Sequence, residues 1–287
     1  RGEINQDECL SAVRQRAREL TGGARDGFLG QALAITPDAL DLWRDRVTGG
    51  ELPLSSDELV RLIGVLDPTT QSTNRLVSEA MRRAHDWAQQ ADALRRVIGD
   101  ASMTAPRRVF AAMLLAESSA CTEADLPLLA EAHVAGDRDA PGDQHALDRI
   151  LRSNGNAKPS ARARRWLDRA SVVALETSFD AGAPLRHTDL SDVSVPELDD
   201  PDRLLGLTNK ARAAGMFDAF VAANATRLAG ALEGMSDLEA RVALIGPVLS
   251  YTPDTRAIEF ARTEDRTDDA IVGSVFRSEE HTSELQS

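Results

Sequence analysis

The longest stretch of this chain without Gly or Pro, residues 71–98, constrains the fold more than any other feature. Its apolar residues recur at alternating spacings of three and four, which places them in one stripe along a helix. Such a stripe has to be buried against other helices. The sequence therefore predicts one long helix that organises the domain around it. The stripe consists of Val77, Ala80, Ala84, Trp87, Ala91, Leu94 and Ile98, with Trp87 as its anchor.

Two kinds of partner could cover this stripe: a second chain in a coiled coil, or neighbouring helices of the same chain. About three heptads is the lower limit for a coiled coil, and several stripe residues are Ala, which buries little apolar area. We therefore expect the helix to pack internally, between the N-terminal helices and a helical hairpin at residues 106–134.

Most other segments also carry signals for the start and end of a helix. Thr122-x-x-Asp125 is predicted to open a helix, Ser236-x-x-Glu239 has the pattern of a capping box, and Gly136 and Gly215 are predicted to end helices. Strand signals are almost absent, because only residues 193–195 alternate and a Pro follows at once. We predict an all-α fold of stacked antiparallel helices, either an irregular α-solenoid or a multi-helical bundle.

The predicted hairpin has two short helices with apolar residues on one face of each. This pair resembles a HEAT-type repeat unit, and the resemblance implies a helical solenoid that binds other proteins. No fixed period recurs along the chain, so self-similarity alone does not establish a repeat array. The inward residues are Val109, Phe110, Met113 and Leu114 in the first helix and Leu126, Leu129, Ala130, His133 and Val134 in the second.

Composition divides the chain into parts. Residues 1–178 are predicted to form an N-terminal helical domain, 179–200 a polar linker rich in Pro, Gly, Ser and Asp, and 201–276 a C-terminal helical segment. Residues 277–287 break from this pattern and resemble the translated reading of a sequencing-library adapter, so we leave them out of the fold and the site. We expect the remainder to be a fragment of a longer protein.

The chain is acidic, with a formal net charge of −13 over 287 residues. This balance argues against nucleic acid or an anionic membrane as partner, because both are bound largely through basic residues. No apolar run approaches the ~18 residues that suggest a membrane span. Cys9 and Cys121 are isolated, so neither a disulfide framework nor a cysteine metal site is expected. The compartment stays open, with a preference for the cytoplasm.

Carboxylates at the end of the predicted hairpin are weak candidates for a metal site. Their spacing imitates the oxygen ligands of a helix-flanked calcium loop, but a Pro at the fifth position and Asp in place of the final Glu depart from it. A polar loop between helices explains the same residues. The candidates are Asp137, Asp139, Asp143 and Asp148.

Histidines give a second, weaker metal hypothesis. His85-Asp86 resembles the adjacent pair of the all-helical metal-dependent phosphohydrolases, but no His precedes it in this chain to complete such a site. His133 and His145 have no third ligand at a useful spacing, so a buried structural histidine is the favoured interpretation of His133.

The basic residues Lys158, Arg162, Arg164, Arg165 and Arg169 form the chain's basic cluster. Arg162, Arg165 and Arg169 share one face of a predicted helix and could bind an anion or an acidic partner. Ion pairs with neighbouring acidic helices are the favoured alternative.

Function is not fixed by any motif. The chain lacks GxGxxG, GxxxxGK[ST], HExxH and GxSxG, so no catalytic residue and no cofactor is predicted. We predict a helical scaffold or protein-interaction module, whose partner is another protein or another domain of the same chain. The alternative is a helical accessory region of a multidomain enzyme whose catalytic domain lies outside this sequence.

Overall fold

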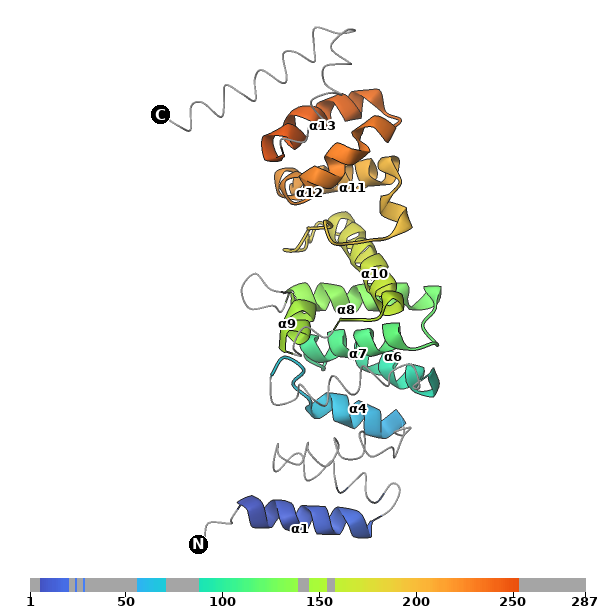
Figure 1. Ribbon diagram of the computed structural model, residues 1–287, viewed down its shortest axis with the longest axis vertical. Helices are drawn as coiled ribbons and strands as arrows, with labels where there is room; N and C mark the ends of the chain where they lie inside the picture. Colours follow the sequence, from blue (N-terminus) through green and yellow to red (C-terminus); the bar gives the residue numbers. More distant parts are fainter. Residues whose placement is uncertain are drawn as a thin grey trace, which may run out of the picture. The chain divides into compact units, whose positions relative to one another are not determined.

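A computed structural model describes residues 6–20, 24, 28, 56–70, 88–138, 145–153 and 158–252. Every regular element in these residues is a helix, which confirms the predicted all-α class (Figure 1). The likeness to HEAT repeats stays a prediction. The chain divides into two compact units, Arg1–Ala170 and Ser171–Ser287, and the division falls inside one helix. Each unit is described by itself.

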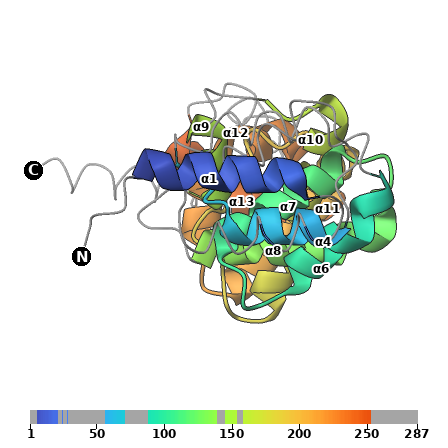
Figure 2. The same cartoon turned by 90° about the horizontal axis from the view of Figure 1, so that it is seen from below.

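The described part of the first unit is a set of short helices. Its core is made by α4, α6, α7, α8 and α9, with α6 packed against α4, α7 and α8 and with α9 packed against α7 and α8. Helices α4, α7 and α8 overlap when this unit is seen from below, in Figure 2, so they lie one above another in Figure 1. The elements are α1 (Gln6–Glu19), α4 (Ser56–Val65), α6 (Ala91–Gly99), α7 (Ala105–Glu117), the 3-10 helix η4 (Glu123–Asp125), α8 (Leu126–Arg138), α9 (Ala146–Ser153) and the first half of α10 (Ala161–Asp180).

Helix α7 is the most enclosed helix of this unit. Its run from Arg108 to Ala116 is buried on every side, since α6, α8, α9 and α4 all contact it. Phe110, Met113 and Leu114, which the sequence placed inward, lie in the core at 2% exposure or less. The predicted inward residue Leu129 of α8 is buried as well, whereas His133 and Val134 are half-buried.

The predicted long helix is seen only at its C-terminal end. Residues 88–90 form a 3-10 turn and α6 begins at Ala91, so the expected unbroken helix is wrong at this point. The buried Gln90 accepts a hydrogen bond from Ser56 Oγ at 2.7 Å, which ties the break to the start of α4. Ala91, Leu94 and Ile98 are buried as the stripe predicts, and the stripe's earlier residues, including Trp87, lie outside the described residues.

Gly136 does not end a helix, contrary to the prediction. It lies inside α8, where an added Cβ would come within 2.7 Å of Val109 Cγ2 and 2.9 Å of His145 Cε1. The glycine is therefore required by close packing of three segments and not by a left-handed backbone. Gly215, in contrast, has a φ of 73° and ends α11 as predicted.

The described part of the second unit places α12 between α11 and α13 (Figure 1). An edge-to-face contact between Phe179 and Phe220, with ring centroids 5.9 Å apart, joins the end of α10 to α12. Salt bridges from Arg203 to Glu176 and from Lys210 to Asp180 join α10 to α11. The elements are the second half of α10, η5 (Pro196–Leu198), α11 (Pro201–Ala213), α12 (Phe217–Ala231), η6 (Leu232–Gly234) and α13 (Leu238–Tyr251).

Residues 179–200, predicted to be a polar linker, belong to this second unit. Their leucines and Val195 are buried, and α12 holds their backbone at residues 188 and 190. The Asn224 side chain accepts from the Leu190 amide at 2.8 Å and donates to the Thr188 carbonyl at 2.8 Å. The predicted domain bounds stay a prediction, but this segment buries several of its apolar side chains. The buried residues are Leu185, Leu190, Val195 and Leu198.

The helix caps are partly as the sequence predicts. Thr122, which was predicted to open a helix, does so through a reciprocal capping box with Asp125. At the start of α13 the cap is Asp237, whose carboxylate accepts from the Ala240 amide, and not the predicted Ser236. Ser236 instead donates its amide to Asp202 at 2.7 Å, a contact between segments that a local pattern does not reveal.

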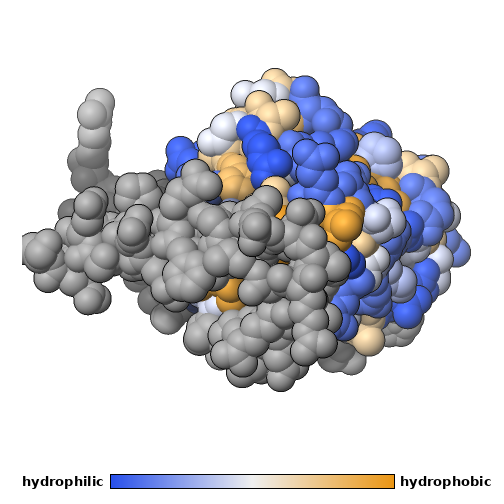
Figure 3. Space-filling model, turned by 90° about the horizontal axis from the view of Figure 1, so that it is seen from above, coloured by the Kyte–Doolittle hydropathy of each residue, from blue (hydrophilic) through white to orange (hydrophobic). Residues whose placement is uncertain are grey.

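The surface of the described residues is mainly hydrophilic on the face shown in Figure 3, where hydrophobic residues occupy separate areas. Leu238 and Tyr251, at the two ends of α13, are large apolar residues that are about half exposed, at 52% and 51%. None of the described helices has the length and apolar character that a membrane span requires.

Candidate functional site

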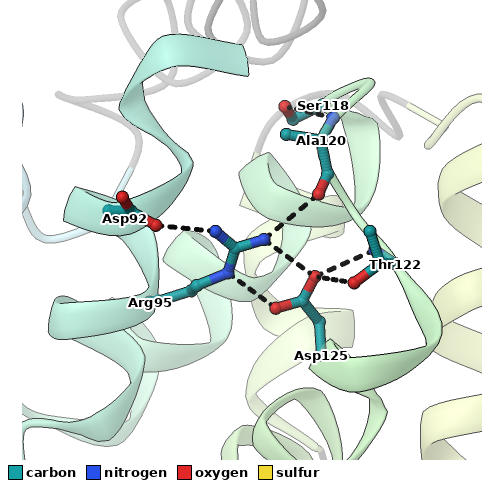
Figure 4. Close-up of polar contacts among 6 residues, drawn as sticks. All are labelled: Asp92, Arg95, Ser118, Ala120, Thr122 and Asp125. Atoms are coloured by element: carbon teal, nitrogen blue, oxygen red, sulfur yellow. Dashed lines mark hydrogen bonds and ion pairs between the residues drawn. The ribbon is translucent and has the colours of Figure 1, made fainter.

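The turn between α7 and α8, residues 118–125, contains a polar network that joins it to α6 (Figure 4). Ser118 and Asp125 are buried there, at 0% and 4% exposure. The turn is built locally: the Ser118 amide closes the end of α7 on the carbonyls of Leu114 and Leu115, and the Thr122 amide donates to Asp125 at 2.9 Å. These bonds satisfy backbone groups that a helix end leaves unpaired.

Arg95 of α6 enters this turn from the side, between Asp92 and Asp125 (Figure 4). Its guanidinium makes a two-pronged contact with Asp125, from Nε to Oδ1 at 2.7 Å and from Nη2 to Oδ2 at 3.1 Å. The same Nη2 donates to the Ala120 carbonyl at 3.1 Å, and Nη1 donates to Asp92 at 2.7 Å. The planar fork of arginine fits a carboxylate in this way, so the pair fixes orientation as well as charge.

The charges of this pair reinforce each other. The hydrogen bond with Asp125 raises the pKa of Arg95 above its ordinary value, against the opposing effect of burial. The same hydrogen bond, assisted by the amide and hydroxyl of Thr122, lowers the pKa of Asp125. Both groups are therefore charged at neutral pH, which suits an ion pair that holds helices together. A general acid or base needs a pKa close to the working pH, which neither group has.

Cys121 lies in the same turn and is 5% exposed. Burial, with a further contribution from the Asp125 charge, raises the pKa of its thiol to about 12. The thiolate is the reactive form of cysteine, so this side chain is suited to packing and not to nucleophilic chemistry.

The predicted basic cluster lies on α10 beside this turn. Arg162 donates from Nη2 to the Ser119 carbonyl at 3.1 Å, and Arg169 pairs with Glu123 at 2.5 Å. Arg169 also lies over the Trp166 ring, 5.5 Å from its centroid. Of the three predicted anion-binding residues, Arg169 makes an ion pair within the chain, Arg162 bonds to a backbone carbonyl, and Arg165 is exposed.

The start of α10 is fixed to the same region. Glu117, the last residue of α7, accepts from the Ser160 amide at 2.7 Å, and Ser160 Oγ accepts from the Ala163 amide as an N-terminal cap. A carboxylate at this place is also favoured by the positive end of the helix dipole. Together with Arg162 and Arg169, these bonds hold α10 against the α7–α8 turn.

The predicted calcium ligands are only partly described. Asp137 is buried at 1% exposure in the last turn of α8, and Asp148 is exposed in the first turn of α9. Asp139 and Asp143 lie outside the described residues, as do His85 and Asp86. Within the part of the chain that the structure describes, no three His, Cys, Asp or Glu side chains gather as a metal site would need. The calcium site stays a prediction.

The structure does bring His133 and His145 together. Their rings stack with centroids 4.3 Å apart, beside an apolar pocket lined by residues of α7, α8, α9 and α10. His145 is buried, at 5% exposure, whereas His133, for which a buried structural role was the favoured interpretation, is only half-buried.

Sequence reasoning missed Arg95 and Asn224, two side chains that make polar contacts with segments distant in sequence. For Arg95 the sequence offers one signal, the i, i+3 spacing to Asp92. It offers none for Asp125, which is 30 positions away. Asn224 stands in an apolar helix, and a polar residue within such a helix is itself a sign of a buried hydrogen-bonded role.

Comparison of the chain with protein-family models, with curated proteins and with solved structures finds no match.

Proposed function

We propose that this chain is a helical scaffold that binds another protein, with the exposed start of α10 as a contact surface. The proposal rests on the ion pairs around the α7–α8 turn. Arg95, Asp125, Arg169 and Glu123 are engaged in holding helices together. These ion pairs make the helices rigid. A rigid surface loses less conformational entropy when a partner binds.

The proposed contact surface consists of exposed basic side chains on the first turns of α10 and just before it. Lys158, Arg162, Arg164 and Arg165 are all exposed, in a chain whose net charge is −13. This local excess of positive charge would attract an acidic segment of a protein partner and would increase its rate of association. Arginine is also well suited to bidentate contacts with carboxylates.

The experiment is chemical crosslinking in cell extract followed by identification of the captured proteins. A variant with Lys158→Glu and Arg165→Glu is compared with the wild-type chain and with Arg61→Glu, which reverses one charge at an exposed position of α4. We expect specific capture by the wild type and by Arg61→Glu, and reduced capture by the double variant with an unchanged circular dichroism spectrum. Equal capture by all three would remove the start of α10 from the proposal.

A nucleic-acid partner is not expected, and the same variants test this. At about 0.15 M salt, fluorescence anisotropy of a labelled oligonucleotide should show no binding to the wild-type chain. Tight binding that is lost in the double variant would replace the protein partner by a nucleic acid.

The second candidate function is a helical accessory region of a multidomain enzyme. It is favoured by Leu238 and Tyr251, because half-exposed apolar side chains at the ends of one helix could pack against a further domain. Recovery of the complete reading frame is the test. Recognisable catalytic motifs outside this sequence would support the accessory role, and further helix pairs would support the scaffold.

A further inference from the structure

Four large side chains share one face at the start of α10. Arg162, Arg165, Trp166 and Arg169 follow one another at spacings of three, one and three, and such positions form a single stripe along a helix. Arg162 and Arg169, at the two ends of the stripe, both bond to the α7–α8 turn. Trp166 therefore lies between arginines at the edge where α10 meets this turn.

The Trp166 ring is held in place by contacts within the first unit. It is half-buried, and its buried part packs against the hydrophobic core. The guanidinium of Arg169 lies over the ring, 5.5 Å from its centroid, and is itself paired with Glu123. The hydrogen bond from Arg169 lowers the pKa of Glu123, so this pair is charged at neutral pH. A ring fixed in this way loses little conformational entropy when a partner packs on it.

The part of the ring that solvent reaches lies among positive charges. Arg162 and Arg165, four positions and one position before Trp166, are both exposed. Tryptophan and arginine are the side chains most enriched among the residues that dominate the binding energy of protein interfaces. The guanidinium groups favour carboxylates, and the indole favours an apolar side chain.

We propose that the contact surface at the start of α10 selects an acidic segment that carries one aromatic or long aliphatic side chain. That side chain packs on Trp166, and carboxylates on either side of it bind Arg162 and Arg165. The inference rests on the proposed function and adds the chemistry of the partner to it. Positive charge alone would accept any acidic segment, so Trp166 is the residue that determines specificity.

Single-stranded nucleic acid is also bound by cations combined with aromatic rings. Proteins that bind it stack successive bases on several rings. In the described part of the contact surface Trp166 is the one aromatic side chain. One ring fits one apolar side chain of a peptide better than a row of bases, and an oligonucleotide is included in the test.

The experiment compares two labelled peptides that differ at one position. Both consist of Asp and Glu, with either Phe or Ala at the centre, and their binding to the full chain is measured by fluorescence anisotropy at about 0.15 M salt. We expect the Phe peptide to bind at least about tenfold more tightly, as contact with a dominant interface residue implies. The change is made in the peptide, so the result does not depend on whether a protein variant folds.

Variants of the chain assign the difference to Trp166. Trp166→Ala should bind the Phe peptide no more tightly than the Ala peptide, and Trp166→Phe should keep part of the preference because an aromatic ring remains. Val60→Ala is the matched control, since it shortens a half-buried side chain of α4 that packs on the same core. It should leave the preference unchanged. Circular dichroism confirms that each variant is folded.

A spectroscopic measurement shows whether the ring is touched. The chain has three tryptophans, and the indole N–H signal of Trp166 in nitrogen-15 spectra is the one that Trp166→Phe removes. The Phe peptide should shift this signal more than the Ala peptide does. An unchanged signal at saturating Phe peptide would contradict the proposed contact.

The outcomes separate this inference from the proposed function. Equal binding of the two peptides, lost in the variant with Lys158→Glu and Arg165→Glu, would overturn the role of Trp166 and leave the charged surface in place. Absence of binding by both peptides would count against the charged surface as well. Tighter binding of a single-stranded oligonucleotide than of the Phe peptide would assign the surface to nucleic acid and overturn the inference.

Discussion

Each of the two units contains an irregular segment that is held in place, and the two are held by different chemistry. In the first unit the α7–α8 turn is fixed by the ion pair of Arg95 and Asp125. In the second unit the backbone at Leu190 and Thr188 is held by a neutral group, the Asn224 amide. An ion pair depends on pH, whereas an amide does not, so these two segments should respond differently to acid.

Arg227 adds to the neutral arrangement in the second unit although it is itself charged. It donates to the Val193 carbonyl at 2.5 Å from the same face of α12 that carries Asn224. Backbone carbonyls do not titrate, so this contact also persists in acid. The comparison shows that a segment of polar composition can have an ordered place in the fold. The condition is that side chains of a neighbouring helix form hydrogen bonds with its backbone groups.

The largest expected effect is the loss of the Asn224 amide. Asn224→Ala removes the bonds to Leu190 and Thr188 and leaves these backbone groups buried without their partner, at a cost of about 3 kcal/mol in the free energy of unfolding. Urea denaturation measures it. Asn209→Ala, at an exposed position of α11, is the matched control and should change stability little. Equal effects of the two variants would mean that Asn224 does not hold the segment.

The next effect tests how closely the first unit is packed. Gly136→Ala places a methyl group 2.7 Å from Val109 Cγ2 and should destabilise the protein by about 2 kcal/mol. Thermal unfolding followed by circular dichroism measures this. A stable Gly136→Ala variant would show that α7, α8 and His145 can move apart without loss.

Acid should weaken the first unit through Asp125. Asp125→Asn removes the ion pair and should cost about 1–2 kcal/mol at pH 7, allowing for the partial exposure of Arg95. Because the folded-state pKa of Asp125 is lowered, its contribution is present above the unfolded value of about 3.9 and is lost as pH falls through the folded value. The difference between wild type and variant in urea denaturation should therefore shrink below about pH 4.

Two controls sharpen this prediction. Asp92 is the other partner of Arg95, and the Asp92 side chain is 91% exposed. Asp92→Asn should therefore lower the free energy of unfolding much less than Asp125→Asn at every pH. Asn224→Ala should show the same loss at pH 7 and in acid, since no titrating group is involved. A difference for Asp125→Asn that persists unchanged at pH 3 would show that charge is not what holds the α7–α8 turn.

The smallest effect has the opposite sign. Gly206 lies inside α11 in the second unit, and an added Cβ there would meet nothing within 4 Å. Gly206→Ala should therefore stabilise the protein by about 0.5–1 kcal/mol through helix propensity. Thermal unfolding of this variant beside Gly136→Ala compares two helix glycines directly. Destabilisation by both would mean that the surroundings of Gly206 are more crowded than the structure shows.

The sequence alone determined the features that depend on near neighbours. The all-α class follows from helical spacing and from the scarcity of strand patterns. The capping box of Thr122 and Asp125 and the helix end at Gly215 follow from groups within one turn of each other. Such interactions are set by local backbone geometry, so they can be predicted without knowing the fold.

Tertiary structure decided what depends on partners distant in sequence. Asp125 meets Arg95 across 30 positions and Asn224 meets Leu190 across 34, and no local pattern specifies either pair. The same holds for Gly136, which looks like a helix end in sequence but lies where Val109 and His145 approach α8. Packing of whole helices brings these groups together, and the free energy of burial then fixes which polar groups must pair.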